Sequence, residues 1–553
     1  MIADIAIAFP AAVLAAILLW PLNDPVRGGL AGKSLLVLAV TLALAALFTP
    51  AFDGYRSDLW VYLAVSERIA AGDWLLGREP FRLEPPAGPH HSAIWILTGL
   101  LNRWLHIPVH TLARLAGILG IGLALFAGWR LASAALPERR ALASALFLLS
   151  LSGLWAAIGL NRNVAIPLAM LAAAETLKPS GRFPLASLWI ALAFWVHFFG
   201  GLLACGAFAL AVMAASNGPP PFPWKRHLLA LAAGLTGALP PLAYHLSNAG
   251  TPVLNPDYLW GPGQFTWNGL RLLNPLQLLR EIPPTLLVLG MAGLLTSRWS
   301  GPLLPSGLRL SRYGSAAVAL LLLTPLYHLF SEHLGGWLAL RTVPLAFLWL
   351  PAAAAIATLT RPEQGLPARL AATLLAACIF WQGAARVVRD FRHDGLHFPF
   401  SAGAQAEARS FRPLLEGRHY LSIEGIAYAL AAPTLGHPAA VTPGRASPFH
   451  PWKRRAADLS MAFSANSVAC WAEFFRRHPE TEYLVTPSPE AAVERQLWNE
   501  LLPGISPESV REKFMEPGAL DPAAEGRWFI VDRIDTGRIV TAESGTCAAL
   551  QAE

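Results

Sequence analysis

The sequence predicts an α-helical polytopic membrane protein with about 10–13 transmembrane helices and a C-terminal extracytoplasmic α/β domain. The first observation is composition: 54% of the 553 residues are hydrophobic and 14% are charged, whereas soluble domains have about 25% charged residues. The second is distribution. Residues 1–50 and 109–385 are mostly apolar runs, and residues 386–553 have the composition of soluble protein. We therefore expect a transmembrane domain over 1–385 and a soluble domain over 386–553.

The apolar runs have the length of membrane-spanning helices. Roughly 20 apolar residues cross the hydrocarbon core, and a backbone in lipid must satisfy its own hydrogen bonds. The run 184–215 is too long for one span and is divided at Gly200-Gly201, near His197. The first run lacks the positive start of a signal peptide, so we expect it to be retained. The runs lie at about 2–20, 34–50, 109–135, 141–159, 164–177, 184–198, 200–215, 227–247, 283–297, 313–330, 342–359 and 367–385.

Lysine and arginine between the runs predict the orientation, because they stay on the cytoplasmic side. Alternate short loops hold Arg27, Lys33, Arg139, Arg140, Lys178, Arg182, Lys225, Arg226, Arg298, Arg309, Arg312, Arg361 and Arg369. The other set is then external: 51–108, 161–163, 248–282, 331–341 and the tail 386–553. This predicts a multi-pass protein of the inner (plasma) membrane, with both chain ends and the tail extracytoplasmic.

Charge and cysteine content bear on two further properties, nucleic-acid binding and disulfide bonding. The net charge of +7 does not indicate nucleic-acid binding, because the cations are scattered singly and form no basic face. Cys205 and Cys378 lie in apolar runs. Cys470 and Cys547 lie in the tail, where a disulfide is possible if the tail is extracytoplasmic. The sequence leaves bonded and free forms of this pair equally open.

The tail alternates strand and helix signals, which predicts a small α/β domain. Tyr483-Leu484-Val485 and Trp528-Phe529-Ile530-Val531 are typical of buried strands. Residues 468–477 predict a helix with Val468, Trp471, Phe474 and Phe475 on one face, and Ser467 is suited to cap its start.

The first external loop, 51–108, contains the most informative segment. A helix is predicted from Asp58 to Ala71, with Ser57 or Asp58 as cap and Gly72 as stop. Its apolar residues suit a position at the membrane surface. Two interpretations of Asp58 remain: it only caps the helix, or its carboxylate takes part in chemistry beside the bilayer.

Further along this loop, Glu84-Pro85-Pro86-Ala87-Gly88-Pro89-His90-His91-Ser92 precedes an apolar segment. Paired histidines can bind a metal or a phosphate. Adjacent histidines rarely ligate one ion, however, and no third ligand is convincingly spaced. A structural role or a hydrogen bond to substrate is therefore favoured over a metal site.

Ionisable residues gather at the predicted outer ends of the spans. Such groups often line a functional cavity, although each one alone is also explained by snorkelling to the interface. Arg341 and Arg162 suit a lipid phosphate, which arginine grips in bidentate fashion. The set is Arg162, His197, His245, His328, Glu332, His333 and Arg341, and the loop 248–282 adds Asp257 among aromatic and amide residues.

Together these residues resemble the GT-C superfamily of membrane glycosyltransferases, which includes protein O-mannosyltransferases and the aminoarabinose transferases of lipid A. The likeness covers most of residues 30–385. It is carried by four short segments and by the external domain that closes the chain. The segments are Ser-Asp-Leu-Trp-Val-Tyr-Leu-Ala from Ser57, Pro85-Pro86 with His90-His91, Trp195-Val196-His197-Phe198-Phe199-Gly200, and a late external turn ending in Arg341.

The resemblance implies a polyprenyl-phosphate-linked sugar as donor and an acceptor (glycan, lipid or protein) on the outer face. Asp58 is then the general base for the acceptor hydroxyl. Arg341, with Arg162 and His197, holds the donor phosphate and stabilises its charge as leaving group. His90 and His91 contact phosphate or acceptor. Many relatives have Asp-Glu at the start of this loop, whereas Leu59 follows Asp58 here. Asp257 and Glu332 are candidates for a second acid, and the resemblance leaves the need for a divalent metal (Mg or Mn) open.

Two other functions are compatible with a membrane protein of this kind. A transporter or flippase for a lipid-linked substrate predicts repeated halves with paired broken helices, and the sequence has no such symmetry. A surface-polysaccharide polymerase or ligase predicts large external loops between late spans, whereas the external mass here lies at the C-terminus.

Overall fold

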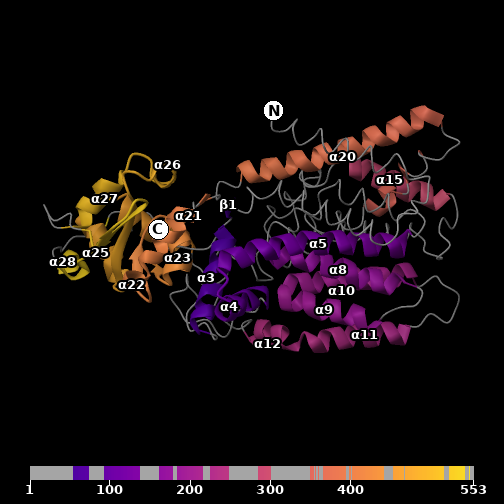
Figure 1. The fold of residues 1–553 in the computed structure, drawn as a ribbon, viewed down its shortest axis with the longest axis horizontal. Coiled ribbons are helices and arrows are strands. Elements are labelled where there is room, and N and C mark those ends of the chain that lie inside the picture. The colour runs from indigo at the N-terminus through magenta and orange to yellow at the C-terminus, as the bar shows by residue number, and fades with distance from the viewer. Residues whose placement is uncertain are drawn as a thin grey trace.

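The computed structural model has two parts: a helical bundle and a mixed α/β tail domain, shown at right and left in Figure 1. Most of the described residues are helical, and the tail contains a small sheet. The described residues are 54–55, 57–73, 93–136, 161–178, 183–215, 224–247, 284–299, 349–353, 355–356, 359, 365–393, 398–399, 402–440, 452–465, 467–515, 522–541 and 547.

Helix α8 (Asn161–Leu177) lies at the centre of the bundle. It packs against α5 (Val109–Ala135), α9 (Phe183–Val196) and α10 (Phe198–Ala215). Residues 168–174 of α8 are all buried, which is the pattern of a helix surrounded by other helices. Helix α11 (Trp224–Gly237) packs on α9, and α12 (Leu239–Ser247) continues from it.

The run 184–215 is divided into α9 and α10, as the sequence predicted, and the break lies at His197. Small residues make this corner tight. A Cβ atom on Gly200 would lie 2.1 Å from the Cβ of Ala165, and one on Gly201 would overlap the ring of Phe194. Glycine is therefore needed at both positions for the two helices to meet α8 and each other.

The other long helices are α15 (Pro284–Trp299) and α20 (Gly365–His393), which pack together. Gln382 joins them: its amide nitrogen donates to Thr285 Oγ1 at 2.8 Å, and its oxygen accepts from the Thr285 amide at 3.0 Å. Within the described ranges, no helix has both the length and the apolar character needed for a membrane crossing. The expected 10–13 spans therefore stay a prediction.

A five-stranded sheet organises the tail in the order β4 (His437–Pro438), β3 (His419–Leu421), β5 (Thr481–Pro487), β7 (Phe529–Arg533) and β6 (Ala524–Glu525). The first three strands are parallel, and β7 is antiparallel to both β5 and β6. The two segments predicted as buried strands are β5 and β7, neighbours in register with Val485 opposite Val531.

Helices cover the sheet, and the predicted helix at 468–477 is α25 (Val468–Arg477). Phe474 and Phe475 are buried as expected, but Val468 is 39% exposed and lies outside the core. Ser467 occupies the N-cap position, but its hydroxyl oxygen accepts no capping hydrogen bond. The remaining tail helices are α21 (Ala402–Ser410), α22 (Arg412–Leu415), α23 (Glu424–Thr434), α24 (Trp452–Phe463), α26 (Ala492–Leu501), α27 (Pro507–Phe514) and α28 (Thr536–Thr541).

The described part of the loop 51–108 contacts the tail. Strand β1 (Gly54–Tyr55) pairs with β2 (Phe398–Pro399), and α3 (Ser57–Ala71) packs between α4 (Ala93–Leu105) and α23. Leu63, Val65 and Ile69 are buried in one core with tail residues. The apolar face of α3, which suits a membrane surface, is therefore covered by protein. The predicted domain boundary after residue 385 falls inside α20.

Candidate functional site

Asp58 is the second residue of α3, one position after the helix begins. The C-terminal end of α3 agrees with the sequence: Gly72 has φ +107°, and the amides of Gly72 and Asp73 bond to the carbonyls of Ile69 and Arg68 at 3.0 Å. This pair of bonds is the Schellman stop, which favours glycine. Helix α3 thus ends where predicted and begins one residue earlier, at Ser57, so that Ser57 and Asp58 are its first two residues. The position of the Asp58 side chain lies outside the described atoms.

Arg162 and His197 come from adjacent elements of the bundle. Arg162 lies in the first turn of α8, one turn before Ala165, which touches Gly200 beside His197. The His197 ring is half-buried, and its Nδ1 accepts the Gly200 amide at 3.4 Å. That bond helps cap the start of α10. Helix α8, which begins at Asn161, thus packs beside the break that holds His197, and a shared site for Arg162 and His197 stays a prediction.

The remaining predicted site residues lie outside the described residues. They are His90, His91, Arg341 and the two candidate second acids, Asp257 and Glu332. Among the described residues, no group of three or more His, Cys, Asp and Glu side chains is placed to hold a metal. The roles of these residues and of Mg or Mn stay predictions.

The polar contact between α3 and the tail involves Arg68, which was not predicted. Arg68 is 9% exposed, and its Nη2 donates to the Leu435 carbonyl at 3.0 Å. The same nitrogen lies 3.1 Å from His437 Nε2 and 3.4 Å from His437 Nδ1. Burial lowers the pKa of Arg68, while Asp73 acts in the opposite direction. A buried cation on α3 therefore meets the edge of the tail sheet.

Behind His437, the ring of His419 stacks at a centroid distance of 4.9 Å and an interplanar angle of 16°. The two histidines are register partners on the parallel strands β3 and β4. Both side chains are 7% exposed. The guanidinium group and the two imidazoles thus form a buried column running from α3 into the sheet.

A second buried polar pair lies in the tail. His478 Nε2 is 3.0 Å from Asp458 Oδ2, and Arg477 donates to Asp458 Oδ1 at 2.9 Å. Burial opposes the charged imidazolium, but the Asp458 hydrogen bond, with help from Glu480, raises the pKa of His478 above its ordinary value. Burial likewise opposes ionisation of Asp458, yet the contacts with His478 and Arg477 lower the pKa of Asp458 overall.

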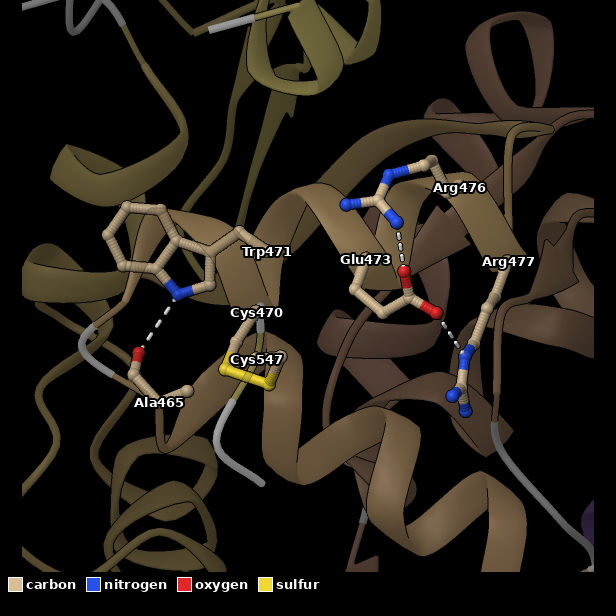
Figure 2. The surroundings of a disulfide bond; sticks show 7 residues. All are labelled: Ala465, Cys470, Trp471, Glu473, Arg476, Arg477 and Cys547. Atoms are coloured by element: carbon tan, nitrogen blue, oxygen red, sulfur yellow. Dashed lines mark hydrogen bonds and ion pairs between the residues drawn. A yellow bond between two sulfur atoms is a disulfide. The ribbon is translucent and has the colours of Figure 1, made fainter. Parts of the chain in front are cut away.

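Cys470 and Cys547 are bonded to each other, with Cα atoms 4.6 Å apart. Figure 2 shows the bond beside two other contacts of α25: Trp471 Nε1 donates to the Ala465 carbonyl at 2.9 Å, and Glu473 accepts from neighbouring arginines. The disulfide fixes the last described residue of the chain to α25.

No protein-family model and no curated protein matches this sequence. Solved structures do match. ArnT from Cupriavidus metallidurans in the apo state aligns with a TM-score of 0.50 and 15% identity, over 94% of this chain and 100% of ArnT. Arabinofuranosyltransferase AftD from Mycobacteria aligns with a TM-score of 0.50 and 18% identity, over 83% of this chain. This chain spans only 35% of AftD.

At sequence identities of 15% and 18%, these two structural alignments establish the fold and nothing more. ArnT and AftD share the overall fold of this chain over the aligned residues. The chain therefore has the GT-C fold.

Proposed function

We propose that this chain is a membrane glycosyltransferase that moves a sugar from a polyprenyl-phosphate-linked donor to an acceptor on the extracytoplasmic face. The observation that carries the proposal is the GT-C fold over 94% of the chain and 100% of ArnT, combined with Asp58 in the first turn of α3. Fold likeness alone does not fix a reaction. Asp58, at the start of α3, supplies the carboxylate that the proposed reaction needs as a base.

A membrane location is supported by the outer surface of the helices. Leu119 is 71% exposed, Leu229 is 69% exposed and Leu374 is 66% exposed. They belong to a wider set of exposed large apolar residues on α5, α9, α10, α11, α15 and α20. Extended exposed apolar surface marks a membrane or protein interface. Lipid around the bundle explains this surface, and the positive loops then orient it in the plasma membrane with the tail outside.

The proposed reaction is a displacement at the anomeric carbon of the donor sugar. Asp58 accepts the proton of the acceptor hydroxyl, the acceptor oxygen bonds to the anomeric carbon, and the bond to the phosphate oxygen breaks. The polyprenyl phosphate leaves with the electron pair. Arg341, assisted by Arg162 and His197, stabilises the charge on that phosphate. His90 and His91 contact the phosphate or the acceptor.

The test is the variant Asp58→Asn, expressed in cells that lack the unmodified protein. The amide keeps the shape of the carboxylate but cannot act as base, so we expect surface glycan to fall by about 100-fold or more. Glu512→Gln, on an exposed position of α27, makes the same chemical change far from α3 and should leave the glycan unchanged.

Protein level and melting temperature of both variants are measured alongside the glycan. Unchanged glycosylation by Asp58→Asn at normal protein level would overturn the proposal and return the transporter and the polymerase or ligase to consideration.

A further inference from the structure

The contact between Arg68 and His437 has a geometry that fixes how the two groups meet. Arg68 Nη2 is nearly equidistant from the two ring nitrogens, at 3.1 and 3.4 Å. A ring carbon and its hydrogen separate those nitrogens, so one donor in the ring plane cannot approach both this closely. The guanidinium nitrogen therefore lies over the imidazole face. His419 stacks on His437 as well.

This column favours uncharged imidazoles. A guanidinium over an aromatic face is attracted to the ring's π electrons, and arginine stays charged at every physiological pH. A proton on His437 would place a second positive charge within 3.4 Å of Arg68 in a site where all three side chains are at most 9% exposed. Like charges repel strongly where water is excluded.

Other charged groups surround the column. On the Arg68 side, Asp73, Tyr420 and Glu416 act on the guanidinium, and the neighbouring Glu67 on α3 faces Arg409 and Arg412. On the far side, Glu480 interacts with His419 and His478. Glu480 therefore favours a proton on His419, whereas the contact with Arg68 opposes one on His437.

We propose that Arg68 is a positioning residue: its contact with His437, which stacks on His419, holds α3 on the tail domain at neutral pH and releases it when His437 takes up a proton. Once α3 is undocked, an exposed imidazole with the ordinary pKa of about 6.5 binds a proton more readily, so acid favours the released state. Because α3 also carries Asp58, release would shift the acid that the proposed function requires, and this last step alone rests on that function.

The release acts on the docking of α3 and not on the tail as a whole. The buried Asp458–His478 pair inside the tail becomes stronger as its imidazole is protonated. Acidification therefore weakens the α3 junction while it strengthens this internal contact of the tail.

The test is a double-variant cycle on the full-length protein in detergent, using Arg68→Gln, His437→Gln and both together, with melting temperature measured at pH 7.5 and 5.5. At pH 7.5 the two changes should be coupled: each alone lowers the melting temperature by about 2–4 °C, and the second change then costs little. At pH 5.5 the coupling should vanish or change sign.

Arg418→Gln is the matched control, because Arg418 adjoins His419 but its 3.0 Å ion pair with Glu482 lies at the surface. Its cost should be small at both pH values. Arg68→Lys keeps the charge and should retain the pH dependence if Arg68→Gln folds poorly. Equal coupling at both pH values would overturn the proposal.

An activity measurement separates this proposal from the proposed function. If Asp58→Asn abolishes glycan transfer, Arg68→Gln should lower transfer at pH 7.5 and flatten its fall toward pH 5.5. If transfer by Arg68→Gln falls with acidification as it does in the wild type, Arg68 does not position Asp58. If transfer does not depend on Asp58, the proposed function is wrong, but the melting result still stands.

Discussion

The Asp458–His478 pair shows how one buried contact sets a pH window. The pKa of His478 is raised from its ordinary value of 6.5 and that of Asp458 is lowered from 3.8. The His478 contribution to stability is therefore complete below about pH 6.5 and is lost as the pH rises through the raised pKa. The Asp458 contribution is present above about pH 3.8 and is lost as the pH falls through the lowered pKa.

We therefore expect His478→Gln to lower the melting temperature of the full-length protein more at pH 5.5 than at pH 8.5. Glutamine can accept or donate a hydrogen bond but cannot become a cation, so it loses the charge-assisted bond to Asp458. Thermal melts of wild type and variant at both pH values measure this difference. Asp458→Asn should show the same trend, and a pH-independent loss for both variants would contradict the ion-pair interpretation.

Helices α3 and α4 depend on one close approach between their backbones. A Cβ on Gly99 of α4 would lie 2.6 Å from the Ser66 carbonyl oxygen and 2.8 Å from Ile69. Gly99→Ala must therefore push α4 away from α3, which we expect to cost about 1–3 kcal/mol. Gly122→Ala is the control, because among the described residues a Cβ there would meet no atom of another element within 4 Å and alanine favours a helix. Thermal melts check both; an equal effect of the two changes would contradict the close-packing argument.

Local signals predicted individual elements well. The extent of α3 follows from Ser57 and Gly72, α25 follows from its apolar periodicity, and β5 and β7 follow from short runs of buried residues. Contacts between distant elements left no such signal. Arg68 meets His437 across 369 residues, and in the sequence it is an ordinary basic residue in the last turn of a helix.

At the scale of the whole molecule, alternation of the positive loops predicts which ends of the helices lie together. The structure joins the loop 51–108 to the tail through β1 and β2 and through the packing of α3 on α23. That Arg162 and His197 share one end of the bundle stays a prediction. Loop charge reports a side of the membrane but not a distance between side chains. Loop charge therefore predicts that the candidate site residues lie on the same side of the membrane. It does not show whether their side chains meet in one cavity, which stays a prediction.

The Cys470–Cys547 bond tests the predicted location of the tail, because disulfides persist in oxidising compartments and are rare in the cytoplasm. In a Cys205→Ser, Cys378→Ser background, only the tail pair remains. Cells are lysed directly into acid, and the protein is denatured and reacted with a maleimide polymer that shifts its gel mobility. An extracytoplasmic tail predicts no adduct without reductant and two adducts after reduction.

Adding Cys470→Ser to that background should leave Cys547 free and give one adduct without reductant, which identifies the partner. Two adducts from unreduced cells, with both cysteines present, would instead place the tail in a reducing compartment. Because the tail packs on α3, that result would move the first loop and Asp58 to the cytoplasmic side as well, and the predicted orientation of the chain would be inverted.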